Sequence, residues 1–358
     1  MNAPFRPLRQ ALRLVDLREP EEAARISAFV VGHTGGSPFH LPDWLLAVAE
    51  ATGVAAYAVV VEHGEEIVGY LPLNEIRSPI FGAVLASSGF AVGGGALLAE
   101  GADGDALIAA AEELAGRRSV SSLELRGGTL PLNREGWTVR TDAHCGFSAP
   151  LAENDEEQLL AIPRKQRAEV RKSLENDLVV EIGSAASDRA AHFTCYAESV
   201  RNLGTPVFPR ALFERVLDRF GQAADILTVR HQGEPVASVL SLYHRGAVMP
   251  YWGGGTRDAR RLRANDRMYY ELMLHARRRD CALFDFGRSK TGSGAYHFKR
   301  NWGFEPQPLA YAAWTLPGCE RRDADPTSAR HALQIAVWQR LPLALANRLG
   351  PLIARGLG

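Results

Sequence analysis

Residues 59–68 read VVVEHGEEIV, and residues 227–236 read LTVRHQGEPV. Each segment is an apolar run, a turn that contains glycine, and a second apolar run. This is the pattern of a β-hairpin. The same short pattern therefore occurs once in each half of the chain.

The landmarks around the two hairpins are repeated as well. The interval from Pro38 to Gly64 of the first hairpin and the interval from Pro206 to Gly233 of the second differ by a single position. The glycine triplets 93–95 and 253–255 follow the hairpins, and their intervals to the next strand-like segments, 123–127 and 284–288, again differ by a single position. Several landmarks in one order and at nearly equal spacing indicate a tandem duplication.

Helical periodicity fills the interval after each triplet, at 105–117 and at 266–278. A long helix over 156–174 opens the second half, and Pro150 marks the boundary. We therefore expect an α/β protein with two tandem domains of mixed, twisted sheets flanked by helices. The expected limits are 1–150 and 151–318, followed by an amphipathic C-terminal tail over 319–358.

The composition is that of an ordinary globular protein: 358 residues, 46% hydrophobic and 23% charged, with 41 basic and 41 acidic side chains. A net charge of zero excludes bulk attraction to nucleic acid. The four cysteines form no C-x-x-C pair, and neither a signal peptide nor an apolar run long enough to span a bilayer is present. These features predict a cytoplasmic protein.

The second half of the chain ends with the segment 287–304, GRSKTGSGAYHFKRNWGF. It predicts a strand that runs into a loop rich in glycine and hydroxyl groups, then a two-turn helix that Gly303 ends in the left-handed conformation. Such a loop turns backbone N–H groups, hydroxyls and cations toward one place, which suits an anion or a developing oxyanion. The alternative is a solvent-facing loop with a basic rim.

Residues 295–304 of this segment resemble the last helix of GNAT acyltransferases, A-x-x-F-Y-x-x-x-G-F. Lys299 stands where those enzymes carry a tyrosine that acts as general acid toward the leaving thiolate. The F-K-x-x-W-G form, the tandem halves and the basic segment 163–172 together resemble the FemAB family over residues 20–315. The motifs F-G-R-S-K-x-G-x-G-x-Y-H-F-K-R-N-W-G-F and L-G-T-P-V-F-P are most similar to FemAB-related proteins associated with PEP-CTERM/exosortase and exopolysaccharide loci.

The FemAB resemblance implies a transferase of acyl or aminoacyl groups. FemAB proteins add amino acids from aminoacyl-tRNA to peptidoglycan precursors, and relatives are thought to use acyl-CoA. The coiled-coil arm thought to help engage tRNA has no counterpart here, and the GNAT coenzyme A fingerprint is not clean after Gly253, Gly254 and Gly255. The resemblance therefore implies a donor near the glycine triplet and leaves open whether acyl-CoA or aminoacyl-tRNA serves as donor. No bound cofactor is expected.

Three residues are candidates for catalysis. Lys299 would stabilise the oxyanion or hold an anionic group of the acceptor, or it is a surface lysine. Tyr296, three residues earlier on the helix, would be a hydrogen-bonding partner or a packed tyrosine. Asp285 would act as a base or orient Lys299.

Two further groups are candidates for substrate binding. Arg288, Ser289 and Lys290 would hold a substrate anion. The FemAB resemblance implies that a stripe of basic residues on the predicted helix grips a diphosphate-linked sugar through charge-assisted bonds, and the alternative is a solvated face. Aromatic and polar residues near the landmarks would line the site or belong to the core. The stripe is Arg164, Lys165, Arg167 and Arg171, and the lining residues are Thr205, Tyr251 and Trp252.

The tail over 328–358 carries four Arg and no acidic residue. It suits an amphipathic segment, broken at Pro342 and Pro351, at the cytoplasmic face of an anionic inner membrane, or else a helix packed on its own domain or on a partner. No G-x-S-x-G, H-E-x-x-H or Walker A motif occurs, and no metal is predicted.

The sequence thus predicts an N-acyl or aminoacyl transferase. Its acceptor would be an amine of an anionic, small-molecule or lipid-linked precursor of the envelope or of an exopolysaccharide. The alternative is a catalytically silent scaffold or binding protein of the exopolysaccharide machinery.

Overall fold

A computed structural model describes residues 10–319 and 332–358 of the chain. Close contacts divide the protein into two compact units. Among the described residues, unit 1 comprises 10–140, 310–319 and 356–358, and unit 2 comprises 141–309 and 332–355. The division falls inside a strand, ten residues before the domain limit expected from the sequence.

Unit 1 contains a mixed sheet with the strand order β1-β2-β3-β4-β6-β14. All neighbouring strands are antiparallel except β4 and β6, which are parallel. Its elements are β1 (Ala11–Val15), α1 (Pro20–Gly32), η1 (Pro38–His40), α2 (Pro42–Thr52), β2 (Ala55–His63), β3 (Glu66–Ser78), β4 (Gly82–Ser87), β5 (Leu97–Leu98), α3 (Gly104–Arg117), β6 (Ser122–Arg126) and β14 (Pro306–Thr315).

The core of unit 1 lies between its sheet and helix α3. Alternate residues of β2, such as Val59 and Val61, pack with Leu107 and Ile108 of α3. The intervening residue Val60 is also fully buried, since α1 and α2 contact β2 or β3 as well. The sheet is therefore covered by helices.

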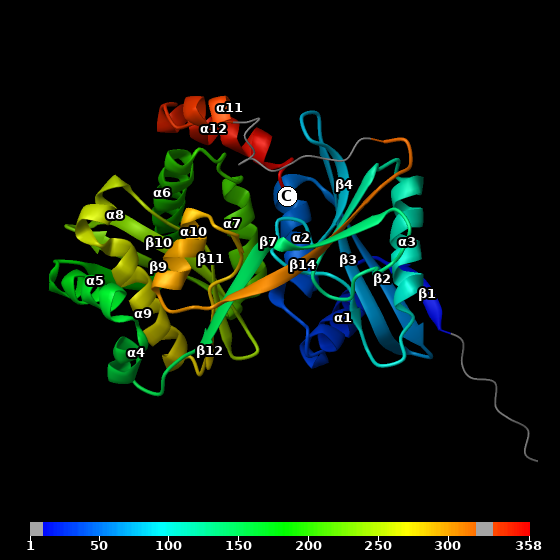
Figure 1. Ribbon diagram of the computed structural model, residues 1–358, viewed down its shortest axis with the longest axis horizontal. Helices are drawn as coiled ribbons and strands as arrows, with labels where there is room; N and C mark the ends of the chain where they lie inside the picture. The colour runs from blue at the N-terminus through cyan, green and yellow to red at the C-terminus, as the bar shows by residue number, and fades with distance from the viewer. Residues whose placement is uncertain (1–9, 320–331) are drawn as a thin grey trace, which may run out of the picture. The chain divides into compact units, whose positions relative to one another are not determined.

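Unit 2 repeats this topology with the order β8-β9-β10-β11-β12-β7, in which only β11 and β12 are parallel. Figure 1 shows its strands among the helices α4 to α10. Its elements are β7 (Trp137–Pro150), α4 (Asp155–Ala161), α5 (Arg164–Glu175), β8 (Val179–Gly183), α6 (Ala186–Leu203), α7 (Arg210–Phe220), η2 (Gly221–Ala223), β9 (Ala224–His231), β10 (Glu234–His244), β11 (Ala247–Gly255), α8 (Arg257–Leu262), α9 (Ala264–Arg278), β12 (Leu283–Asp285), β13 (Ser289–Lys290), α10 (Gly294–Asn301), α11 (Ala332–Trp338) and α12 (Leu343–Ala354).

The sixth strand of each sheet comes from outside the repeated order. β14, which follows the second copy in sequence, pairs through Tyr311–Thr315 with β6 of unit 1. β7, which follows the first copy, pairs through Ser148–Pro150 with β12 of unit 2. Each copy of the repeat thus receives its last strand from a segment that lies beyond its own end.

Both hairpins and both crossover helices confirm the sequence prediction. The turn of the second hairpin has positive φ at Gln232 (52°) and Gly233 (84°), which is the geometry that a two-residue hairpin turn requires. The two sheets also agree with a duplication, because in each of them four antiparallel strands are followed by a helix and then by a strand parallel to the last of the four. The mixed α/β architecture expected from the sequence is confirmed.

Two local predictions were wrong. The helix expected over 156–174 is two helices, α4 and α5, because Pro163 has no N–H to donate and holds Ile162 extended (φ −69°, ψ 132°). The second glycine triplet is not a turn but the end of β11.

The tail forms α11 and α12, and residues 320–331 lie outside the described part of the chain. The break at Pro342 is confirmed, whereas Pro351 lies inside α12. The preceding residue is Gly350, which has no Cβ to collide with the proline ring, and so the helix continues.

Candidate functional site

The segment after β12 forms the loop and short helix expected from its sequence. The Ser293 hydroxyl accepts a hydrogen bond from the Tyr296 N–H at 3.2 Å and begins α10. Gly303, with φ 90°, follows the helix and reverses the chain. The loop also contains the short strand β13, which pairs with His144 and Cys145 of β7 and was not anticipated.

Lys299 is buried in the centre of this segment, with 8% of its surface exposed. Its ammonium Nζ donates hydrogen bonds to the carbonyl oxygens of Gly287 (3.1 Å) and Arg288 (2.9 Å). The same atom lies 5.5 Å from the ring centroids of Phe147 and Phe286. The alternative of a surface lysine is therefore wrong.

The surroundings of Lys299 make its proton easier to lose. The pKa of Lys299 is lowered from 10.5 to about 8, mainly by burial; the negative charge of Asp285 opposes this shift and the positive charge of Arg288 adds to it. The Asp285 carboxylate in turn accepts a hydrogen bond from the Gly287 N–H at 2.9 Å. Burial raises the pKa of Asp285, while that hydrogen bond and the charge of Lys299 lower it. A proton-transfer group with a pKa near the working pH is well suited to acid–base catalysis.

Tyr296 contacts the same aromatic wall as Lys299 but does not bond to it. Its ring packs edge-on against Phe147 at 5.4 Å, and in the described part of the chain no hydrogen bond joins it to Lys299. Tyr296 is half-buried. The helix thus brings Tyr296 and Lys299 together through Phe147.

Arg288, Ser289 and Lys290 differ in their environments. Arg288 is half-buried and Lys290 is exposed. Ser289 is buried, and its hydroxyl oxygen has no hydrogen-bond partner among the described residues. Only the two cations therefore lie where a dissolved anion could reach them.

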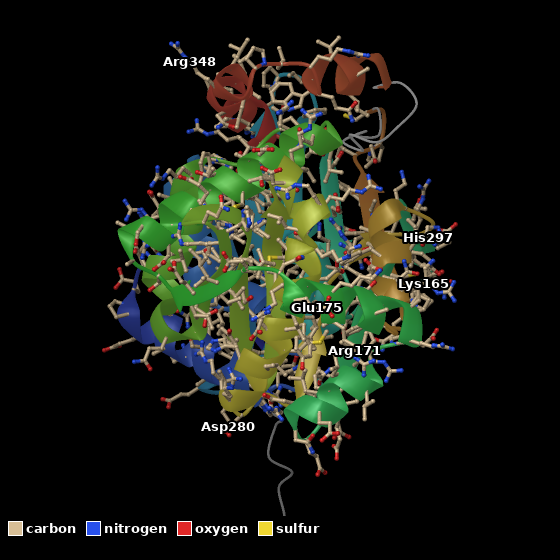
Figure 2. The ribbon with its side chains drawn as sticks, turned by 90° about the vertical axis from the view of Figure 1, so that its left-hand side faces the viewer. Lys165, Arg171, Glu175, Asp280, His297 and Arg348 are labelled. Atoms are coloured by element: carbon tan, nitrogen blue, oxygen red, sulfur yellow. The ribbon has the colours of Figure 1, made fainter. Side chains whose placement is uncertain are left out.

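Helix α5 carries the predicted basic stripe on its outer side. Gln166, Val170 and Ser173 form its buried face. Arg164, Lys165 and Arg171 are exposed, whereas Arg167 is half-buried and donates to the Leu160 carbonyl. Figure 2 shows Lys165 and Arg171 on the outside of α5 and His297 on the outside of α10.

The start of α5 adjoins the end of α10. A Cβ built on Gly303 would lie 3.0 Å from the Pro163 ring, and Pro163 immediately precedes Arg164. The basic stripe therefore begins beside the turn that ends the Lys299 helix. The structure brings these two predicted groups into one neighbourhood of unit 2.

Trp252, Tyr251 and Thr205 occupy structural positions. Trp252 is buried and packs edge-on against Phe213 at 4.9 Å, with Tyr251 beside it at 4.8 Å. The Thr205 N–H donates to the Val200 carbonyl and closes the end of α6. Trp252 is thus buried in the core, and the assignment of these three residues to substrate binding stays a prediction.

The glycine triplet allows helices to approach both faces of β11. On one face, a Cβ on Gly254 would lie 2.5 Å from Cβ of Ser199 in α6. On the other face, a Cβ on Gly253 would lie 3.2 Å from the Tyr269 hydroxyl of α9, and one on Gly255 would lie 2.5 Å from Cβ of Ala259 in α8. Close packing accounts for these glycines, and their assignment to the donor stays a prediction.

Sequence reasoning missed Phe147 and Tyr269. The Tyr269 ring packs on Phe286 at 4.7 Å and on Phe298 at 5.7 Å, so it links the Lys299 wall to Gly253. Burial raises the pKa of Tyr269 to about 12. Phe298 and Trp302, four residues apart on α10, were the visible signal for an aromatic cluster, but nothing local indicated that Phe147 would join it.

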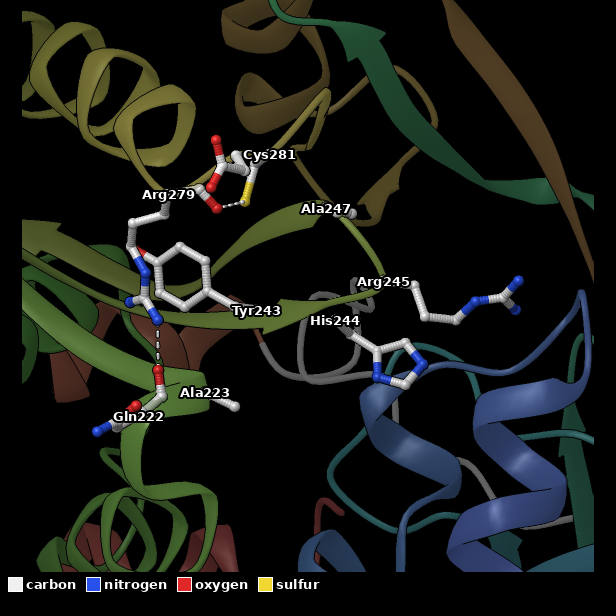
Figure 3. A pocket seen from close by; sticks show the side chains of 10 residues that line it. Gln222, Ala223, Tyr243, His244, Arg245, Ala247, Arg279 and Cys281 are labelled. Carbon is white, nitrogen blue, oxygen red and sulfur yellow. Dashed lines mark hydrogen bonds between the residues drawn. The ribbon is translucent and has the colours of Figure 1, made fainter.

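A separate hollow of about 370 Å³ lies at the opposite end of β11 from the glycine triplet. Figure 3 shows Tyr243, Arg279 and Cys281 along its wall. Arg279 lies over the Tyr243 ring at 3.7 Å. None of the predicted site residues lines this hollow.

Within residues 10–319 and 332–358, no group of three His, Cys, Asp or Glu side chains gathers as metal ligands would. None of the helices in these ranges combines the length and apolar character needed to cross a bilayer.

Residues 164–300 match the family model described as acetyltransferase (GNAT) domain. No curated protein sequence matches the chain significantly. Among solved structures, FemX is 15% identical, has a TM-score of 0.65, and the match covers 84% of this chain and 96% of that one.

Two further structures show the same likeness. A tandem GNAT protein from the clavulanic acid biosynthesis pathway is 14% identical with a TM-score of 0.56, covering 87% of this chain and 100% of that one. L-PGS from Bacillus licheniformis is 12% identical with a TM-score of 0.55, covering 90% and 96%. The chain thus has the mixed α/β fold of tandem GNAT proteins such as FemX.

Proposed function

We propose that the protein is an N-acyl or aminoacyl transferase whose reaction centre is built around Lys299 in unit 2. The observation that supports this most is the burial of a single lysine against two backbone carbonyls and two aromatic rings. Burying an ammonium group is costly unless its hydrogen bonds are satisfied. A lysine kept there at that cost fits a chemical role better than a packing role.

In the proposed reaction the acceptor amine attacks the acyl carbonyl carbon. A C–N bond forms, the electron pair of the C=O bond moves to oxygen, and the tetrahedral intermediate then expels the thiolate or ribose hydroxyl of the donor. The Lys299 ammonium has three N–H groups, of which two are given to carbonyls. The third would donate to the oxyanion.

Lys299, supported by Asp285, would also carry out the proton transfers of the reaction. The attacking amine loses one proton and the leaving group gains one. Lys299, with its pKa lowered to about 8, can donate a proton near neutral pH and recover it. Asp285 keeps the charged form accessible and is a positioning residue in this scheme.

The acceptor is proposed to be an amine of an anionic envelope or exopolysaccharide precursor in the cytoplasm. The exposed cations Arg164, Lys165 and Arg171 on α5 support an anionic ligand, since several charge-assisted bonds could hold a diphosphate. They begin beside the turn after α10. The donor is proposed to be acyl-CoA or an aminoacyl-tRNA.

The deciding experiment compares precursor pools by mass spectrometry in cells with the wild-type chain, with Lys299→Met and with no protein. We expect one acyl or aminoacyl mass to be present only with the wild-type chain. Lys172→Met, which changes an exposed lysine that is not among the proposed site residues, is the matched comparison for charge. Identical pools in all strains would refute an enzyme and favour the scaffold.

A binding experiment separates the two donors. Coenzyme A at 100 times its Kd should raise the free energy of unfolding by about 2.7 kcal/mol, because it binds only the folded state. An aminoacyl-tRNA user should instead retain tRNA in a strongly salt-dependent manner. Absence of both effects in a folded protein would contradict the proposed donors.

A further inference from the structure

Helix α12 turns small side chains toward the rest of unit 2. Ala346, Gly350 and Ala354, spaced by four residues along α12, are buried. A Cβ on Gly350 would lie 2.9 Å from Val207, so the helix lies almost in backbone contact with the segment after α6. Helix α12 is therefore a fixed part of unit 2.

Side-chain and backbone bonds also hold α11. The Gln339 side chain donates to the Asn202 carbonyl at 3.2 Å, and Arg201 donates to the Gln339 carbonyl at 3.1 Å. A Cβ on Gly204 would meet the Ile335 side chain. The end of α6 and α11 thus lie side by side.

Large apolar side chains lie on the opposite side of these helices. Leu345, Leu349 and Leu352 share one face of α12, because their spacing is i, i+4, i+7. Leu352 is 68% exposed, and Leu203 at the end of α6 is 70% exposed. We call the following five exposed residues the apolar face: Leu203, Val337, Leu345, Leu349 and Leu352.

All charged side chains that the tail itself places beside the apolar face are arginines. Arg340, Arg348 and Arg355 are exposed, and residues 328–358 contain no Asp or Glu. Arg348 and Arg355 lie seven residues apart, next to the leucine face and away from the buried one. Figure 2 shows Arg348 pointing away from the body of the protein.

We propose that the apolar face and its arginines bind peripherally to an anionic lipid surface. Leucines flanked by arginines match the boundary between acyl chains and negative headgroups, where the leucines leave water and the guanidinium groups stay with phosphates. Because residues 328–358 contain no acidic side chain, nothing in the tail's own sequence repels negative headgroups. The proposal does not depend on the transferase reaction.

The test is sedimentation of the full-length protein, at 50 mM salt, with vesicles that mix one part phosphatidylglycerol with two parts phosphatidylcholine. We expect binding that falls at 500 mM salt and on pure phosphatidylcholine vesicles. The variant Arg340→Gln/Arg348→Gln/Arg355→Gln should bind roughly 100-fold more weakly, since each arginine near the surface contributes about 1 kcal/mol. The variant Leu345→Gln/Leu349→Gln/Leu352→Gln should bind at least about tenfold more weakly.

The matched control is Leu160→Gln/Val179→Gln/Ile182→Gln, which changes three exposed apolar side chains of unit 2 outside the tail. It should bind as the wild-type chain does. Circular dichroism checks that each variant is folded, and the arginine variant keeps every apolar contact of α12. The proposal is overturned if the wild-type chain fails to bind, if the leucine variant binds unchanged, or if the leucine change only dissolves a self-association seen by ultracentrifugation.

Discussion

Replacing Lys299 by Met keeps an unbranched side chain, one heavy atom shorter, and removes its charge. The pH dependence of stability therefore becomes a direct readout of the buried ammonium. The pKa of Lys299 is lowered to about 8 in the folded protein from 10.5. Between these values the unfolded chain binds the proton and the folded chain does not. The wild-type protein therefore gains stability as pH rises from 8 toward 10.5, and the penalty is fully present below pH 8.

The size of this gain follows from the two pKa values. Between pH 7 and pH 10 the free energy of unfolding of the wild-type chain should rise by about 2.5 kcal/mol relative to Lys299→Met. Urea unfolding at both pH values measures it, and subtracting the variant removes the other groups that titrate in this range. Lys290→Met, at an exposed lysine, is the control and should show no such difference from the wild type.

The chain has only four lysines, so NMR of ¹³C-labelled lysine can follow each of them. The signal absent in Lys299→Met should titrate near pH 8. In Asp285→Asn it should titrate lower still, because the Asp285 charge is what raises the pKa of Lys299. The reasoning would be refuted if the free energies of unfolding of the wild type and of Lys299→Met changed equally between pH 7 and pH 10 and if the Lys299 NMR signal titrated above pH 10.

Two more predictions concern unit 2. Burial lowers the pKa of His192 to about 3 from 6.5. Between pH 7 and pH 4.5 the free energy of unfolding of the wild-type chain, measured with urea, should therefore fall by about 2.5 kcal/mol relative to His192→Gln. If it does not fall, this imidazole is in contact with solvent. The buried Asp225 carboxylate accepts hydrogen bonds from Tyr243, His275 and Arg279, and Asp225→Ala should therefore cost about 3–5 kcal/mol. Asp218→Ala, at an exposed ion pair with Arg189, should cost about 0–1 kcal/mol, and equal losses for the two would contradict the reasoning.

Local patterns predicted the elements that local chemistry determines. The hairpins, the helices α3 and α9 and the turn at Gly303 follow from turn residues and apolar periodicity within a few positions. The break at Pro163 was equally readable, since a proline cannot continue the hydrogen bonding of a helix. The charged residues on both sides of Pro163 have helical spacing, and this spacing led to the prediction of one continuous helix.

Features that depend on distant segments could not be predicted in this way. The burial of Lys299 requires Phe147, which lies on β7 at the other end of unit 2 in sequence. The second glycine triplet has the composition of a turn, yet it forms the end of β11, where α6, α8 and α9 pack closely against it. That Leu345, Leu349 and Leu352 face outward on α12 follows from the burial of Ala346, Gly350 and Ala354, which depends on the distant segment at Val207.

The exchange of final strands has a consequence for the order in which the protein forms during synthesis. β6 is complete at Arg126, but its partner residues Tyr311–Thr315 on β14 are translated only after nearly all of unit 2. At about 5–20 residues per second the ribosome needs roughly 10–40 s to produce them. β7, by contrast, is translated before the rest of unit 2. The sheet of unit 1, whose first strands are synthesised first, is thus the later of the two sheets to be completed, and during that interval the open edge of β6 is exposed to chaperones and to other nascent chains.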